Sequence, residues 1–136
     1  MSDPLQSLIR VRQQSQDQAQ TSLSRAIQAA AAAEQAAAAA ETAIRDEQEA
    51  AGALTADDGA VEAFARWLPA ARIRAWEATE QAEWAQGEVA RNRALLTASR
   101  SALESVQELA DGRAAQRAKI RLNHDTRDMA DFRPKR

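Results

Sequence analysis

The sequence predicts an all-α protein in which two long helices form an antiparallel coiled-coil hairpin with a projecting C-terminal helical extension. Three observations predict this fold. Alanine, the best helix former, accounts for 35 of the 136 residues, whereas glycine and proline together account for seven. The segment 52–59 contains two of the four glycines and separates two long runs of helix-forming residues. Apolar residues recur at heptad spacing on both sides of this break.

The first helix is expected over residues 4–51. Asp3 is suited to cap its amino end, and Pro4 fits the first helical turn. Small and apolar residues fill most of the a and d positions of seven heptads. Since most of them are alanine, this seam should bury little area per turn. The a positions are Ile9, Gln16, Leu23, Ala30, Ala37, Ile44 and Ala51, and the d positions are Leu5, Arg12, Ala19, Ala26, Ala33, Ala40, Glu47 and Leu54.

Residues 52–69 are expected to form the tip of the hairpin. Gly52 is suited to end the first helix, and Asp57 or Asp58 can cap a short helical piece that ends near residue 68. Pro69 disfavours helical geometry in the residue before it, so a kink or a restart is expected there.

Bulky apolar residues gather around this tip, and two interpretations of them stay open. They either close the loop end as a small local core or form an exposed patch for a partner. The residues are Phe64, Trp67, Leu68, Ile73, Trp76 and Trp84.

The second helix is expected over residues 70–127, followed by a basic tail at 128–136. Its apolar heptad pattern continues to Ala110 and then becomes basic, so everything after about Gly112 should extend beyond the first helix without a partner. The a positions are Leu68, Ala75, Ala82, Val89, Leu96, Leu103, Ala110, Arg117 and His124, and the d positions are Ala71, Ala78, Ala85, Asn92, Ser99, Val106, Arg113, Ile120 and Arg127.

The net charge of −2 conceals a strong asymmetry along the chain. Residues 34–88 carry twelve acids and four bases, whereas residues 113–136 carry eight bases and three acids. In a hairpin the turn would be acidic, and the end that holds both termini would be basic. This distribution predicts different partners at the two ends.

Several classes of function are not expected. The chain has one histidine, no cysteine and no glycine-rich phosphate loop, so we expect neither an enzyme nor a bound cofactor or metal. Asp125, Asp128 and Asp131 interrupt the basic C-terminal segment, which argues against nucleic-acid binding. No strongly apolar window or amino-terminal apolar region predicts membrane insertion or a signal peptide.

The C-terminal sequence, His124 to Arg136, resembles that of the FliJ family of flagellar type III export proteins. The resemblance rests on a basic run followed by Asp125, Arg127, Met129, Asp131 and Phe132, although Ala130 stands where the family usually has an acid. The opening segment Leu5–Arg12, the chain length, the hairpin pattern and Trp67 beyond the tip are also similar.

This resemblance implies a non-enzymatic stalk in the cytoplasm, associated with the inner membrane through the export apparatus. Its paired termini would enter the ring of the export ATPase (FliI), and the hairpin would reach the export gate (FlhA), with the ATPase regulator and export chaperones as further partners. It implies ring contacts by Leu5, Leu8, Ile9, Arg113, Arg117, Arg121, Arg127, Met129 and Phe132. It implies gate contacts by Phe64, Trp67, Leu68, Ile73 and Trp76.

Two other functions compete with this one. The equivalent stalk of an injectisome secretion system shares the same design. A generic coiled-coil scaffold would instead bind partners all along its seam, and not at its ends.

Overall fold

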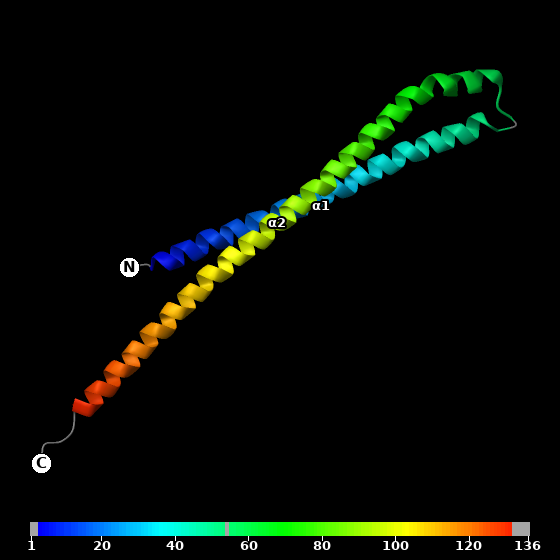
Figure 1. Ribbon diagram of the computed structural model, residues 1–136. Helices are drawn as coiled ribbons and strands as arrows, with labels where there is room; N and C mark the ends of the chain where they lie inside the picture. The colour runs from blue at the N-terminus through cyan, green and yellow to red at the C-terminus, as the bar shows by residue number, and fades with distance from the viewer. Residues whose placement is uncertain (1–2, 54, 132–136) are drawn as a thin grey trace, which may run out of the picture. The chain divides into compact units, whose positions relative to one another are not determined.

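The computed structural model describes residues 3–53 and 55–131. Within these residues the protein is all-helical and contains no strand. It consists of α1 (Pro4–Ala51) and α2 (Asp58–Asp131), two long helices that contact each other (Figure 1). The predicted all-α class with two long helices is therefore confirmed. No helix in the described ranges is both long and apolar enough to cross a membrane.

Both ends of α1 form where the sequence predicts them. The Leu5 amide donates a hydrogen bond to Asp3 Oδ1 at 3.0 Å, so Asp3 caps the amino end. At the other end, the Gly52 amide still donates to the Gln48 carbonyl at 3.0 Å, although the helix itself stops at Ala51. The chain then leaves the helix through a turn that begins at Gly52.

The second helix begins earlier and ends later than expected. Asp57 caps it by accepting a hydrogen bond from the Ala60 amide at 2.8 Å, and the helix then continues through Pro69 to Asp131. Of the kink or restart expected at Pro69, the restart is therefore wrong. A tip extending to residue 69 and a second helix confined to 70–127 are also wrong. Figure 1 shows this helix as one uninterrupted ribbon from green to red.

Pro69 is tolerated inside α2 because its surroundings reduce the cost. Proline has no amide hydrogen to donate to the carbonyl of Ala65, but both residues are exposed, so water can solvate that carbonyl. The neighbouring Leu68 is half-buried and Ala71 is buried, which holds the backbone on both sides of the proline in place.

We expect Pro69→Ala to stabilise the protein by about 2 kcal/mol, because it restores a helical hydrogen bond and removes a steric clash. Thermal unfolding followed by circular dichroism at 222 nm measures this change. The matched control is Pro4→Ala, because Pro4 lies in the first turn, where its missing amide hydrogen costs nothing. An unchanged or lowered Tm for Pro69→Ala would mean that the proline does not strain α2.

Burial follows the predicted heptad positions closely. The nine buried side chains among the described residues all occupy a or d positions. Every a and d residue of α2 from Leu68 to Ala110 is buried or half-buried. In α1 the described a and d residues are also at least half-buried, except the charged Arg12 and Glu47. The buried residues are Leu5, Ala30, Ala71, Ala75, Ala82, Ala85, Val89, Leu96 and Leu103.

The described chain divides into two compact units. The larger one, Ala19–Leu96, contains the second part of α1, the turn and the first part of α2. In its centre Ala30 of α1 packs with Ala85 and Val89 of α2, and Leu23, Ala26 and Ala33 pack around this cluster. Beside the cluster, Gln86 Nε2 donates a hydrogen bond to Glu34 Oε1. Small side chains and one polar pair thus hold the two helices together in this unit.

The other unit combines the chain up to Gln18 with the chain from Thr97. In the described part of this unit, Leu5 and Leu103 are buried, and Ile9, Val106 and Ala110 are half-buried. From Asp111 to Asp131 every residue is helical and every residue is exposed. We call this segment the C-terminal extension. The exposure of its side chains agrees with the sequence, which predicts a helix without a packing partner beyond about residue 112.

Candidate interaction surfaces

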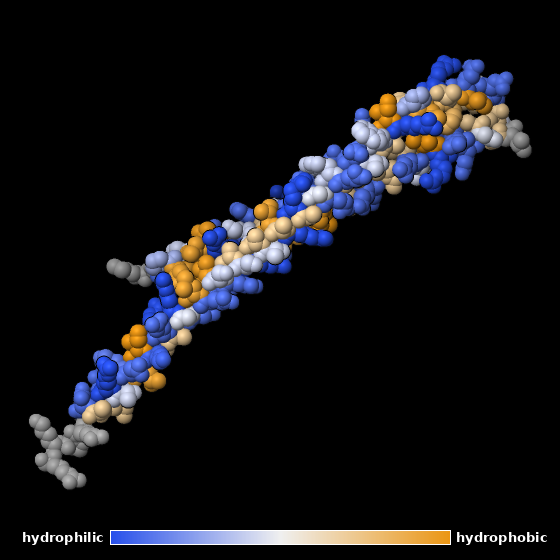
Figure 2. Space-filling model, viewed as in Figure 1, coloured by the Kyte–Doolittle hydropathy of each residue, from blue (hydrophilic) through white to orange (hydrophobic). Residues whose placement is uncertain are grey.

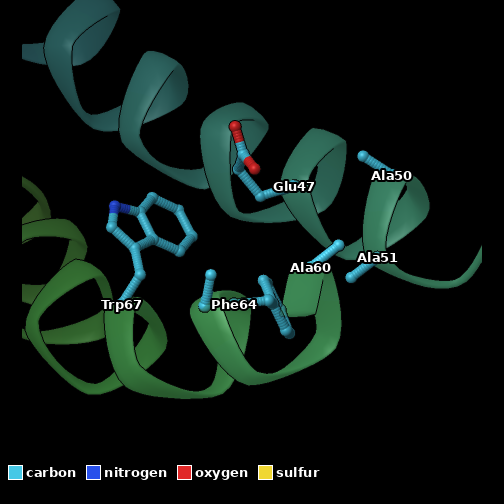
Figure 3. Close-up of a pocket in the computed structure, with 7 residues that line it drawn as sticks. Glu47, Ala50, Ala51, Ala60, Phe64 and Trp67 are labelled. Atoms are coloured by element: carbon cyan, nitrogen blue, oxygen red, sulfur yellow. The ribbon is translucent and has the colours of Figure 1, made fainter. Parts of the chain in front are cut away.

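An apolar groove, which we call the tip groove, lies between the end of α1 and the start of α2. It has a volume of about 380 Å³ (Figure 3). Phe64 and Trp67 form its aromatic wall, with ring centroids 6.1 Å apart and planes inclined at 38°. Glu47 lines the groove from α1 and supplies the one charged group among the described lining residues. The remaining lining residues are Ala50, Ala51, Ala60 and Ala63.

The bulky residues near the turn divide into a half-buried set and an exposed set. Phe64, Trp67 and Leu68 are half-buried and pack locally. In contrast, Ile73, Trp76 and Trp84 are exposed, and Trp76 keeps 64% of its surface accessible. In the view of Figure 2, orange apolar side chains gather where the end of α1 and the start of α2 lie side by side.

The exposed set belongs to one face of α2, which we call the Trp–Glu face. With a and d positions turned inward, Ile73, Trp76, Glu77, Glu80, Glu83 and Trp84 occupy the outward b, c and f positions of the heptad. Two tryptophans thus bracket three glutamates, and no base lies between them in the sequence. The candidate gate contacts include Ile73 and Trp76 but omit Trp84. Trp84 lies at an outward c position of the heptad, and this position is the sequence signal that could have placed it among the candidates.

The candidate ring contacts near the amino end differ in accessibility. Leu5 retains 6% of its surface and is part of the core of its unit, so it is not free to contact a partner. Ile9 is half-buried, and Leu8 is exposed at 38%. Of the three residues, Leu8 is the most available for binding.

The candidate ring contacts in the C-terminal extension are all accessible. Arg113, Arg117, Arg121, Arg127 and Met129 are exposed, as are two further apolar residues that the candidate set lacks, Ile120 and Leu122. Phe132 lies outside the described residues. The segment 113–124 contains four bases and no acid. Among the described residues, no ion pair engages these arginines.

His124, Asp125 and Asp128 form a polar cluster farther along the extension. Their nitrogen and oxygen atoms lie within 4.8 Å of one another, and His124 Nδ1 is 3.2 Å from Asp128 Oδ2. All three side chains are exposed. Such a cluster on an open helix resembles an ordinary i, i+4 surface pair, which contributes only a few tenths of a kcal/mol.

Comparisons with protein-family models, with curated proteins and with solved structures find no match to this chain.

Proposed function

We propose that α1 and α2 form an antiparallel coiled-coil hairpin. Three sets of contacts within Ala19–Leu96 support this arrangement. Ala30 packs with Val89, Glu34 bonds to Gln86, and Glu47 lies near Phe64 and Trp67 across the tip groove. As the residue number rises along α1, that of its neighbour on α2 falls, which is the relation expected of antiparallel helices.

We propose that this hairpin acts as a non-enzymatic stalk or adaptor of the bacterial flagellar type III export apparatus. The observation that carries the proposal is the C-terminal extension, about twenty residues of helix whose side chains are all exposed and whose segment 113–124 contains four bases and no acid. A helical segment of this kind gains little stability from contacts with the rest of its own chain, and it is suited to pack against a partner. The resemblance to the FliJ family names that partner as the ring of the export ATPase.

The Trp–Glu face supports the second part of the proposal, which is binding to the export gate. Exposed tryptophans are typical of the residues that contribute most to protein–protein binding. Ile73 and Trp76 are therefore the better gate-contact candidates, because Phe64, Trp67 and Leu68 are partly occupied by packing near the turn. The protein would work in the cytoplasm, at the inner membrane through the export apparatus, with the ATPase regulator and export chaperones as further partners.

The test is to measure binding of the purified chain to the flagellar export ATPase of the same organism. We expect the full chain to bind and a chain ending at Asp111 to lose binding, because the truncation removes the extension. All removed residues in the described range are exposed, so the rest should fold normally. Equal binding by both chains would contradict a ring contact on the extension. Binding of neither would favour a scaffold or an injectisome stalk.

A further inference from the structure

Two surfaces of this protein carry charges of opposite sign, and three charged side chains on each surface form no ion pair between described residues. On the Trp–Glu face, Glu77, Glu80 and Glu83 are exposed, and no ion pair between described residues engages them. On the C-terminal extension, Arg113, Arg117 and Arg127 are also exposed, and no ion pair between described residues engages them. Each surface also presents bulky apolar side chains, so each can gain both charge pairing and apolar burial from a partner.

The two surfaces also have matching spacing along their helices. Four residues of the Trp–Glu face, Ile73, Glu77, Glu80 and Trp84, and the following Gly87 are separated by intervals of four, three, four and three residues. On the extension the same intervals separate Arg113, Arg117, Ile120, His124 and Arg127. This alternation places the side chains of each set on one face of a helix, the arrangement by which two helices pack along a seam.

We propose that the protein self-associates head to tail, with the C-terminal extension of one copy bound along the Trp–Glu face of a second copy. Arginines of the extension would pair with the three glutamates, and Ile120 would pack beside Trp76 and Trp84. Arginine is also well suited to stack on an exposed indole ring. Because the two surfaces differ, each copy still has one of them free after pairing, so assembly continues beyond a dimer.

This inference does not depend on the proposed export function, since it needs only the purified chain. The two are related in one respect. Self-association would cover Ile73, Trp76 and the arginines, which are the same groups proposed to bind the gate and the ATPase. A stalk stored in this form would become available only when its partners displace the neighbouring copy.

Sedimentation velocity of the full chain tests the proposal. We expect the average mass to rise with protein concentration past that of a dimer, and the association to weaken in high salt because the charges are exposed. Reversing the charge of the Trp–Glu face with Glu77→Lys, Glu80→Lys and Glu83→Lys should weaken the self-association by roughly tenfold or more. Reversing the charge of the extension with Arg113→Glu, Arg117→Glu and Arg127→Glu should weaken the self-association to a similar extent.

Mixing the two reversed variants is the decisive arm. Each variant has lost self-complementarity, but the extension of the first still matches the face of the second, so the mixture should associate again. The matched control carries Glu41→Lys, Asp46→Lys and Glu49→Lys, which change the net charge equally at exposed positions of α1. Circular dichroism verifies that every variant remains helical.

Three results would overturn the proposal. The first is a wild-type chain that stays monomeric at all concentrations in low salt, which would mean that a different protein covers the Trp–Glu face. The second is a control variant that weakens association as much as the face variant, because net charge alone would then explain the effect. The third is a mixture of reversed variants that does not associate.

Discussion

Replacing Leu96 with aspartate is expected to lower the free energy of unfolding by roughly 3–5 kcal/mol. Leu96 retains only 6% of its surface and lies at an a position of the seam. The substitution removes apolar burial and places a carboxylate in a seam whose buried side chains, among the described residues, are alanine, leucine and valine. A seam made of small residues buries little area per turn, so the loss of one leucine is a large share of the local stability.

The neighbouring residue offers a matched control. Leu95 is 61% exposed, and Leu95→Asp makes the same chemical change and the same loss of helix propensity one position away. We expect it to cost about 1 kcal/mol or less. Urea unfolding followed at 222 nm compares the two variants. Similar losses for both would show that Leu96 is not part of a packed seam.

The buried seam could be predicted from the sequence because helix formation and heptad spacing are both local properties. A long run rich in helix formers fixes the direction of the side chains along most of α2, so the a and d positions from Leu68 to Ala110 could be assigned without a structure. The polar residue Asn92 at a d position did not disturb the pattern. Its side-chain amide donates a hydrogen bond to the carbonyl of Glu88 at 2.8 Å, so this polar group has a partner within its own helix.

Other features depended on surroundings that the sequence does not contain. Pro69 predicts a helix boundary by its own chemistry, but the flanking Leu68 and Ala71 are packed and keep the helix continuous. The extent of burial of the aromatic residues near the turn depends on their surroundings. Trp67 is half-buried and lines the tip groove beside the end of α1, whereas Trp76 is exposed. For the same reason Leu5, a candidate contact with the ATPase, is in fact a core residue.

Arg117→Glu combined with Arg121→Glu is expected to abolish binding to the export ATPase, with an affinity loss of roughly a hundredfold or more. Both arginines are exposed, one helical turn apart, in the segment of the extension that has no acid. Reversing two such charges turns attraction to an acidic partner surface into repulsion. Helicity should not change, because both side chains are exposed and no salt bridge between described residues involves either of them.

Binding of this double variant to the purified export ATPase, beside the wild-type chain, is the measurement that tests the stalk most directly. The control is Arg25→Glu with Arg45→Glu, two exposed arginines of α1 whose reversal changes the net charge equally. The stalk proposal predicts wild-type affinity for the control and no measurable binding for Arg117→Glu with Arg121→Glu. Undiminished binding of that double variant, with its helicity intact, would contradict the assignment of the ATPase contact to the C-terminal extension.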